Sequence, residues 1–312
     1  MNKALLRIAT VALILVIIRW AFANPEIPRS ILEAKYGGPP SQFLLLPGNI
    51  RAHVRDRGPR QAQTLILLHG SFDSLIAWEP WASRLSNTLR VVTIDLPGHG
   101  LTGAVNGGDY SEEGMVRFVA KVSDAMGLST FALGGHSMGG RIAARFAEEH
   151  PARLTHLILV DSGGLGKRGG QLVEFTNKVL SKPFLARPLL DIAPRWIWTR
   201  EAEEAVSKKS VLTTRRVNAI WDLNRMEGTR DATILRFASA HSAVKEHLSE
   251  IRTPTLILWG EEDRLIPVEA AKEFHEAIRN SKLLIYKGVG HLPHEEVADE
   301  SAADVRAFLG SQ

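Results

Sequence analysis

A serine lies within a Gly-x-Ser-x-Gly pattern, Gly135-His-Ser-Met-Gly139, near the middle of a chain of 312 residues. A serine hydroxyl is a weak nucleophile unless a nearby base removes its proton. The preceding run, Thr130–Gly134, predicts a strand, and the residues from Gly140 onward predict a helix. A serine at such a turn is held clear of the sheet, and the flanking glycines avoid collisions between neighbouring elements. Ser137 is therefore the candidate nucleophile.

An acid and a base follow Ser137 in the chain order that accompanies a serine at a strand-to-helix turn. The candidate base, His291, comes directly after the last expected strand, and the candidate acid, Asp263, comes just past the strand before it. The imidazole would take the serine proton, while the carboxylate would orient the imidazole and stabilise its charged form. Asp161, at the end of an earlier expected strand, is the alternative acid, although we expect it to shape the exit turn of that strand.

Negative charge that develops on a substrate oxygen needs two backbone N–H donors, which together form an oxyanion hole. Met138, directly after the candidate nucleophile, is expected to supply one donor. The second is expected from Ser71, with Phe72 as the alternative, because both follow His69-Gly70 at the end of another expected strand. We expect the His69 side chain to be structural. We expect His136 to point away from the nucleophile, since side chains alternate along a strand.

Short β-rich runs alternate with helical patterns beyond residue 40, and several of these runs are apolar throughout. Continuous apolar strands are typical of a sheet covered on both faces, and strand–helix alternation indicates crossovers between parallel strands. The first two runs, joined at Pro47-Gly48-Asn49, predict an antiparallel hairpin at one edge. The sequence therefore predicts the α/β class, with a mostly parallel eight-stranded sheet flanked by helices. The expected strands are Phe43–Leu46, Ile50–Arg55, Thr64–Leu68, Arg90–Leu96, Thr130–Gly134, Leu154–Asp161, Thr255–Trp259 and Lys282–Lys287. The expected helices include Glu112–Met126, Gly140–His150, Pro267–Ile278 and Glu296–Leu309.

Residues 163–249 interrupt this alternation, because they show amphipathic helical segments and no convincing strand pattern. We expect this interval to be a helical lid over one end of the sheet, inserted between two parts of an α/β core, residues 25–162 and 250–312. The lid carries a net charge of +6 within a chain whose total is +4. Such clustered positive charge is compatible with an anionic membrane surface as a partner.

Residues 1–24 form a membrane-directing segment, in which a short basic opening precedes the apolar run Ile8–Ile18. Two interpretations remain open. Residues 4–23 could be an uncleaved anchor, since about 20 apolar residues span a bilayer as a helix and flanking arginines can reach the interfaces. Alternatively, the Ala-x-Ala pattern that ends at Ala23 is typical of signal-peptide cleavage. We therefore expect either a protein anchored in the inner or plasma membrane, or a periplasmic or secreted protein.

The motifs taken together resemble the α/β-hydrolase fold superfamily over residues 43–310, lid included. Within it, the chain is similar to membrane-anchored monoacylglycerol-lipase-like enzymes and to small bacterial carboxylesterases. The resemblance implies a serine hydrolase that cleaves carboxylic esters with an apolar acyl group through a Ser-His-Asp triad and an acyl-enzyme intermediate. The residues that carry the resemblance are His69-Gly70, Asp95-Leu-Pro-Gly-His-Gly100, Gly135-His-Ser-Met-Gly139, Asp263 and Gly290-His291.

Other reactions occur on the same fold. A serine at position 137 argues against haloalkane dehalogenases and epoxide hydrolases, in which the resemblance would require an aspartate. Carbon–carbon bond hydrolases of aromatic ring-cleavage products share the Ser-Met-Gly elbow but typically carry Trp after the base, whereas Leu292 follows His291 here. The alternatives to an esterase are thus a carbon–carbon bond hydrolase, a cofactor-free perhydrolase, or a non-enzymatic membrane-tethered binding protein.

Neither a cofactor nor a metal is expected. The chain contains no cysteine, which excludes disulfides, thiolate metal sites and cysteine nucleophiles. Gly164–Gly169 matches G-x-G-x-x-G, but it opens the lid rather than a first βαβ unit, which favours a hinge over a dinucleotide loop. The basic lid lacks the interleaved aromatic and glycine residues of RNA-binding motifs, so we expect no nucleic acid partner. The expected partners are a lipophilic small-molecule ester and a membrane, contacted through residues 4–23 and the basic lid.

Overall fold

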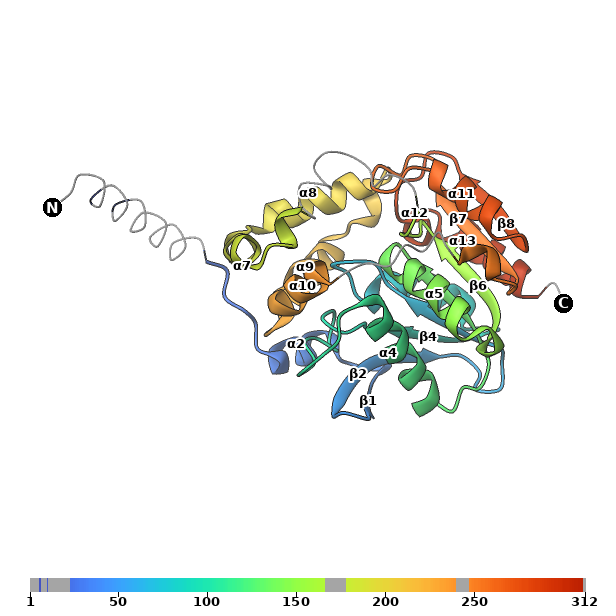
Figure 1. Cartoon of the computed structure of the whole chain (residues 1–312), viewed down its shortest axis with the longest axis horizontal. Coiled ribbons are helices and arrows are strands. Elements are labelled where there is room, and N and C mark those ends of the chain that lie inside the picture. Colours follow the sequence, from blue (N-terminus) through green and yellow to red (C-terminus); the bar gives the residue numbers. More distant parts are fainter. Residues whose placement is uncertain (1–5, 7–9, 11–22, 166–177, 240–246, 311–312) are drawn as a thin grey trace.

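The computed structural model describes residues 6, 10, 23–165, 178–239 and 247–310. Across these residues runs an eight-stranded sheet with the order β1-β2-β4-β3-β5-β6-β7-β8 (Figure 1). β2 is antiparallel to β1 and β4, and the remaining neighbours are parallel. The predicted α/β class is confirmed, and the ends of the expected strands lie within two residues of the observed ones. The strands are β1 (Ser41–Leu46), β2 (Ile50–Arg57), β3 (Thr64–Leu68), β4 (Arg90–Ile94), β5 (Phe131–His136), β6 (Leu154–Val160), β7 (Thr255–Gly260) and β8 (Ser281–Tyr286).

The hairpin between β1 and β2 forms at the edge of the sheet, where the sequence predicts it. Gly48 and Asn49 both have left-handed backbone, with φ of 89° and 56°. Leu46 pairs with Ile50, so Pro47, Gly48 and Asn49 form a three-residue loop, and glycine and asparagine adopt its left-handed backbone most readily.

Helices cover both faces of the sheet, which explains why several of its strands are apolar throughout. Along β3, Leu65 and Leu67 belong to the core on the face of α3 and α13, whereas Ile66 and Leu68 belong to the opposite core, on the face of α4, α5 and α11. Side chains alternate between the faces of a strand, so both sets must be apolar when both faces are buried. These helices are α3 (Glu79–Leu85), α4 (Glu112–Ala125), α5 (Met138–Glu149), α11 (Glu269–Ala277) and α13 (Ala298–Leu309).

The helix expected over Glu296–Leu309 is instead two helices, a short α12 (Pro293–Glu296) and α13, separated at Val297. Neither α2 (Arg29–Tyr36) nor α3 is among the expected helices. α3 follows the 3₁₀ turn η1 (Leu75–Trp78) and contains a proline in its first turn, where a missing N–H breaks no helical hydrogen bond.

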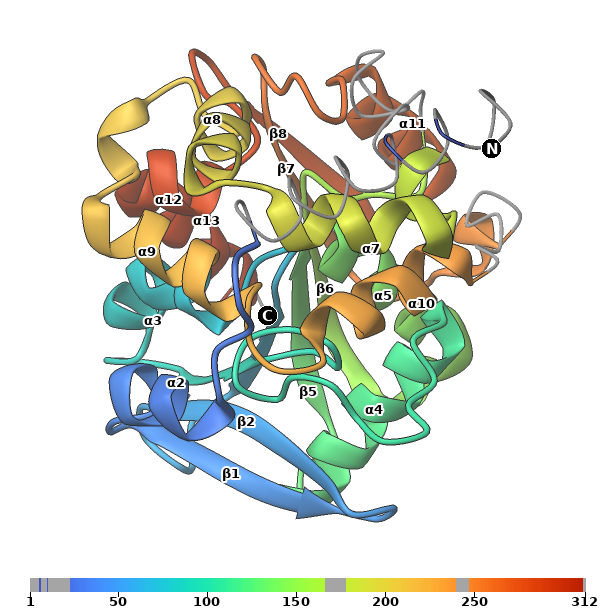
Figure 2. The ribbon, with the colours of Figure 1, turned by 90° about the vertical axis from the view of Figure 1, so that its left-hand side faces the viewer.

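A group of helices lies between β6 and β7 in the chain, within the interval in which the sequence predicts a lid. Figure 1 shows these helices together at one side of the sheet, and Figure 2 shows α7 crossing in front of β6. The expected lid interval, residues 163–249, begins three residues after the end of β6. It ends within the 3₁₀ turn Leu248–Glu250, which precedes β7. The helices of this insertion are α7 (Pro183–Ile192), α8 (Arg195–Ala205), α9 (Thr214–Leu223) and α10 (Thr229–Ala238).

The predicted membrane segment, residues 4–23, falls almost entirely outside the described residues. Among the helices that are described, none combines the length and apolar character needed to cross a bilayer. The chain that follows the segment lies along the insertion, because the Asn24 amide donates to the Asp191 carbonyl in α7 at 2.7 Å and Ile27 bridges to Met226.

Candidate active site

Ser137 occupies the turn between β5 and α5 in left-handed backbone geometry, with φ of 51°. A non-glycine residue adopts this geometry only when its surroundings hold it there. The Ser137 amide donates to the carbonyl of Val160 at the end of β6, at 3.0 Å. The Ser137 carbonyl accepts from the amides of Gly163, at 2.9 Å, and Arg141, at 3.2 Å. The neighbouring strand and the new helix therefore hold the strained turn from both sides.

The two glycines of the motif lie where a side chain would collide with backbone. A Cβ atom built on Gly135 would lie 2.1 Å from the Gly139 carbonyl oxygen. One built on Gly139 would lie 2.3 Å from the Leu68 carbonyl oxygen at the end of β3. The α5 helix can thus approach the sheet closely enough to form the turn only because both positions lack side chains.

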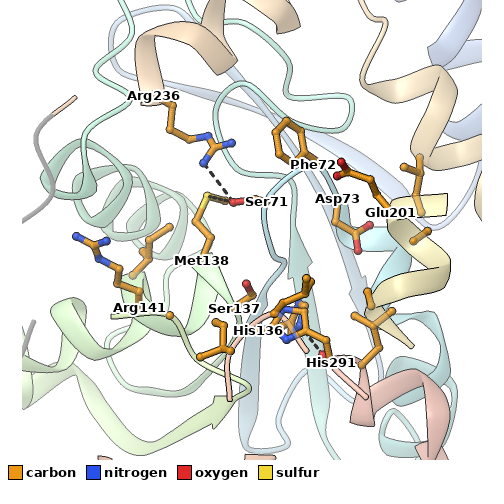
Figure 3. A pocket seen from close by; sticks show the side chains of 18 of the residues that line it. Ser71, Phe72, Asp73, His136, Ser137, Met138, Arg141, Glu201, Arg236 and His291 are labelled. Atoms are coloured by element: carbon orange, nitrogen blue, oxygen red, sulfur yellow. Dashed lines mark hydrogen bonds between the residues drawn. The ribbon is translucent and has the colours of Figure 1, made fainter. Parts of the chain in front are cut away.

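His291 and Asp263 lie within hydrogen-bond distance of one another, as the sequence order predicts. The imidazole Nδ1 of His291 is 2.7 Å from the Asp263 carboxylate, and both residues are buried. The other Asp263 oxygen accepts from the amides of Leu265, at 2.8 Å, and Ile266, at 3.0 Å. With Nδ1 facing the carboxylate, Nε2 of His291 is the nitrogen left to act on a substrate or a nucleophile. His291 and Ser137 line the same cavity (Figure 3).

His136 does not point away from this centre, contrary to the alternation argument. Its ring lies 4.6 Å from the ring of His291 and lines the same cavity. The His136 Nε2 lies 2.8 Å from the main-chain carbonyl oxygen of His291, to which it is placed to donate. Burial and the neighbouring His291 lower the pKa of His136 well below its ordinary value, so the ring is neutral. Residue 136 ends the strand, and the left-handed turn directly after it breaks the regular alternation.

Glu296 organises the loop that carries His291, and the sequence reasoning did not identify this role. One carboxylate oxygen accepts from the amides of Gly290, at 3.0 Å, and Leu292, at 3.3 Å. The other accepts from Ser207, at 2.9 Å, and Lys208, at 2.8 Å, just beyond α8. The sequence offers only an acidic residue shortly after Gly-His-Leu-Pro, which does not reveal that its partners lie on the insertion.

The proposed oxyanion donors lie on two elements that meet beside Ser137. Met138 is the first residue of α5, so its N–H has no partner inside the helix. Ser71 and Phe72 follow β3, and Phe72 has left-handed backbone with φ of 60°. The Ser71 hydroxyl donates to the Met138 sulfur at 3.5 Å, so the two elements touch at this point (Figure 3).

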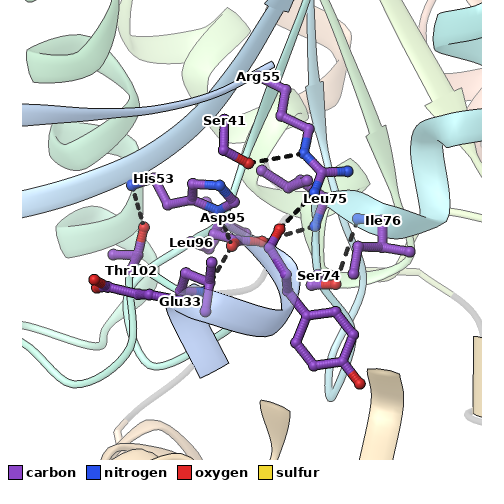
Figure 4. Close-up of polar contacts among 12 residues, drawn as sticks. Glu33, Ser41, His53, Arg55, Ser74, Leu75, Ile76, Asp95, Leu96 and Thr102 are labelled. Carbon is purple, nitrogen blue, oxygen red and sulfur yellow. Dashed lines mark hydrogen bonds and ion pairs between the residues drawn. The ribbon is translucent and has the colours of Figure 1, made fainter. Parts of the chain in front are cut away.

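Asp95 fixes the loop that contains Ser71 and Phe72 (Figure 4). One of its oxygens accepts from the Leu75 amide at 2.7 Å, and the other accepts from the Leu101 amide at 2.7 Å and contacts the His53 ring at 2.6 Å. Although burial pushes its pKa upward, the adjacent His53 holds the pKa of Asp95 below its ordinary value. His69 is structural, as expected, because its ring lies 2.7 Å from the Gly70 carbonyl oxygen and accepts from the Leu96 amide.

The cavity in front of Ser137 has a volume of about 310 Å³ and lies between the sheet and the insertion. Two of its arginines are ion-paired within the protein. Arg216 is 2.6 Å from Asp73 and 2.9 Å from Glu295, and Arg141 pairs with Glu112. Most of the remaining wall is apolar, including Phe72, Met115, Met138, Ile142, Trp198, Leu212, Ile220, Phe237, Leu265 and Ile266.

The sheet order, the helical insertion after β6 and the serine at the β5–α5 turn define an α/β hydrolase. A family model described as alpha/beta hydrolase fold matches residues 63–298, and the chain belongs to this family. Its members and structural neighbours include esterases and lipases, and the protein is a hydrolase.

Curated relatives differ in the bond that they cleave. A 2-hydroxy-6-oxononadienedioate/2-hydroxy-6-oxononatrienedioate hydrolase from Klebsiella pneumoniae is 28% identical, over 83% of this chain and 91% of its own. Monoacylglycerol lipase abhd6-A from Xenopus laevis is 26% identical, over 85% of this chain and 80% of its own. Among solved structures, a bacterial membrane phospholipase A shares the fold with a TM-score of 0.75 and 22% identity, over 99% of this chain and 96% of its own.

Proposed function

We propose that the protein hydrolyses carboxylic esters with an apolar acyl group, using Ser137 as nucleophile, His291 as base and Asp263 as the orienting acid. The observation that carries the proposal is the arrangement of the three residues. A serine held in strained backbone and the hydrogen-bonded His291–Asp263 pair open onto one largely apolar cavity. An apolar acyl chain gains free energy when it leaves water for such a wall, by about 0.8 kcal/mol per buried CH₂ group.

The reaction proceeds in two stages. His291 Nε2 takes the proton of the Ser137 hydroxyl while the serine oxygen attacks the ester carbonyl carbon. His291 then gives that proton to the leaving alcohol, and an acyl-serine remains. A water molecule, deprotonated by His291, attacks the acyl carbon and releases the carboxylic acid, and the proton returns to Ser137. Asp263 keeps the imidazole oriented and stabilises its charged form throughout.

Backbone donors stabilise the oxyanion in both stages. The Met138 amide, at the positive end of the α5 dipole, is the first donor. The Ser71 amide is the second, and the Phe72 amide is the alternative to it. Loss of one such donor typically lowers kcat by about 10²–10³-fold, so the loop that carries Ser71 must hold its amide in place during the reaction.

Carbon–carbon bond hydrolysis is the second candidate, because the name of the Klebsiella relative assigns it an oxo-dienedioate substrate. That substrate class carries carboxylates, which need unpaired positive charge in the cavity. Arg216 faces the cavity but is already paired with Asp73 and Glu295. Arg141 is paired with Glu112. Arg236, also in the cavity wall, donates to the Ser71 hydroxyl at 3.2 Å, and its guanidinium lies over the ring of Phe237. Together with the apolar wall, these contacts favour a neutral ester.

A substrate panel separates the two candidates. Turnover is measured on p-nitrophenyl esters of increasing acyl length, on monoacylglycerols and on a vinylogous diketone carboxylate. We expect turnover of the esters, a preference for acyl chains longer than acetyl, and a loss of three or more orders of magnitude in kcat for Ser137→Ala. Diketone cleavage that exceeds ester cleavage would establish the carbon–carbon reaction instead, and ester turnover that survives in Ser137→Ala would refute both.

We also propose that the protein works at a membrane surface, with residues 4–23 as its anchor. The segment contains the apolar run Ile8–Ile18 flanked by Arg7 and Arg19, and about 20 residues suffice for a helical span when flanking arginines reach the interfaces. The chain that follows it contacts α7, on which Phe184 is 74% exposed, Leu185 41% and Leu189 48%. Clustered exposed apolar side chains of this kind are typical of contact with lipid or protein.

Two measurements test the membrane proposal. The mass of the mature protein from salt-washed membranes should include residues 1–24, whereas a soluble product that begins near Asn24 would establish a signal peptide. Phe184→Glu combined with Leu189→Glu should lower turnover of a vesicle-embedded ester and leave a soluble ester unaffected. Leu45→Glu, at an exposed apolar position on β1, is the matched control and should change neither rate.

A further inference from the structure

We propose that Asp161 is a positioning residue whose neutral carboxyl group donates a hydrogen bond to Asp263, and that it thereby limits how strongly Asp263 attracts the protonated His291. The inference rests on the proposed function only in taking His291 as the base of the reaction. It assigns to the proposed triad a fourth member, which acts through Asp263 and touches no substrate.

Asp161 follows β6 directly, next to the end of β7, after which Asp263 lies. Its amide donates to the Leu258 carbonyl at 3.0 Å, and one of its oxygens accepts from the Gly260 amide at 3.0 Å. Its backbone is left-handed, with φ of 42°, a geometry that needs support from its surroundings. Polar side-chain atoms of Asp161, Asp263 and His291 all lie within 4.8 Å of one another.

Two buried carboxyl groups at this separation cannot both be ionised without a large electrostatic penalty, so one of them holds a proton. The hydrogen bonds decide which one. The Asp263 carboxylate faces three donors, the amides of Leu265 and Ile266 and the His291 ring, and these favour its charged form. Asp161 is fully buried and accepts one bond, from Gly260, while its second oxygen accepts none from the described residues.

The surroundings of Asp161 support the same assignment. Burial, followed by the charge of Asp263, raises the pKa of Asp161 well above its ordinary value. From α12, Glu296 adds a further negative charge that opposes ionisation of Asp161. On β8, burial and then the hydrogen bond to Asp304, at 2.8 Å, raise the pKa of Tyr286, so its hydroxyl keeps its proton and adds no charge beside Asp161. His291 is the third ionisable group of the cluster.

A proton on the second Asp161 oxygen gives that oxygen a partner and places an O–H donor against Asp263. A hydrogen bond donated to a carboxylate withdraws part of its negative charge. Asp263 then holds a protonated imidazole less tightly, and His291 releases its proton to the leaving alcohol more readily. The same bond fixes the plane of the Asp263 carboxylate, which keeps the imidazole aimed at Ser137.

The test is the pH dependence of kcat/KM for a soluble ester, measured for the wild-type protein, Asp161→Asn and Asp161→Ala. The midpoint of the acidic limb reports protonation of the base in the free enzyme. Asparagine reproduces a neutral carboxyl group, because its oxygen can accept from Gly260 and its NH₂ can donate to Asp263. We therefore expect an unchanged midpoint in Asp161→Asn. We expect a rise of about 0.5 pH unit or more in Asp161→Ala, which loses the donor.

An ionised Asp161 predicts a shift of the acidic midpoint in the opposite direction. If Asp161 were ionised, removal of its negative charge would lower the midpoint in both variants, and such a shift overturns the proposal. A change in kcat without any movement of the midpoint in Asp161→Ala also overturns it, because it shows a purely structural role. Should Asp161→Ala fail to fold, Asp161→Asn alone still decides whether residue 161 carries a charge.

A metal site is the alternative interpretation of the cluster of Asp161, Asp263 and His291. Loss of activity on dialysis against EDTA, restored by Zn²⁺, would show that the three side chains bind an ion and would overturn the hydrogen bond. These outcomes are distinct from failure of the proposed function, which would appear as absent ester turnover in the wild-type protein or as persistent turnover in Ser137→Ala.

Discussion

The side chain of His136, directly before the proposed nucleophile, is placed to donate a hydrogen bond to the main-chain carbonyl of His291, the proposed base, at 2.8 Å. The bond joins the β5–α5 turn to the loop after β8, two segments separated by 155 positions in the chain. On the other side of the same residue, the His291 amide donates to the Ala205 carbonyl at the end of α8, at 2.7 Å. The backbone of His291 is thus held by both the sheet and the insertion.

Removal of the His136 donor should misplace the base. We expect His136→Ala to lower kcat for a p-nitrophenyl ester about tenfold, as loss of one buried hydrogen bond is worth about 1.4 kcal/mol, with little change in KM. His136→Gln keeps an N–H donor on the side chain and should recover part of the loss. Equal rates for His136→Ala and the wild-type protein in steady-state assays would show that the bond does not position His291.

Loss of the Glu296 carboxylate should weaken both the base loop and its attachment to the insertion. Four backbone amides donate to this carboxylate, and buried amides left without an acceptor are destabilising. We expect Glu296→Ala to lower the free energy of unfolding, measured by urea denaturation, by about 3 kcal/mol. We also expect it to reduce kcat in an ester assay. Glu300→Gln, at an exposed position on α13, is the control and should leave both unchanged.

Buried histidines should make the protein sensitive to mild acid. Burial lowers the pKa of His99, His136 and His294 well below the ordinary value of 6.5, so the folded protein keeps them neutral. The unfolded chain binds these protons as the pH falls through 6.5, whereas the folded protein does so only at lower pH. The stability that these neutral histidines provide is therefore retained above pH 6.5. It is lost as the pH falls from 6.5 toward the lowered pKa values of the folded protein.

His294 provides the test of this pH dependence, because its ring packs between Trp78 and His136, at 4.3 and 4.7 Å. Each such histidine steepens the fall in the free energy of unfolding by up to about 1.4 kcal/mol per pH unit. We expect His294→Phe to flatten the dependence of the unfolding free energy on pH below 6.5. His275→Gln, at an exposed position, should leave the slope as it is, and an equally steep slope in both variants would contradict the account.

The close approach at the nucleophile turn predicts a severe effect of one methyl group. Gly135→Ala would bring its Cβ to 2.1 Å from the Gly139 carbonyl oxygen, so α5 must move away from the sheet. We expect a clear fall in melting temperature and loss of ester turnover. Gly38→Ala, where nothing lies within 4 Å of the added carbon, should have the melting temperature of the wild-type protein. A folded and active Gly135→Ala variant would show that the turn tolerates displacement.

The sequence by itself determined the order of elements in this protein and the local setting of Ser137, the proposed nucleophile. Continuous apolar runs such as β3 can pack only between two layers of helices, and Gly135 and Gly139 flank Ser137 at a position where only a turn fits. The chain order of serine, acid and base then located Asp263 and His291 at strand ends. These inferences succeed because strand patterning and turn sterics act over a few residues.

Only the tertiary structure decided which distant groups meet. The Glu296 carboxylate lies between His291 and the end of α8, the His136 ring turns toward the base, and Asp161 lies beside Asp263. Each contact depends on how strands and insertion close in space, and no periodicity or spacing along the chain encodes a hydrogen bond between residues a hundred positions apart. The protonation of Asp161 follows in turn from burial and proximity, which exist only once the chain is folded.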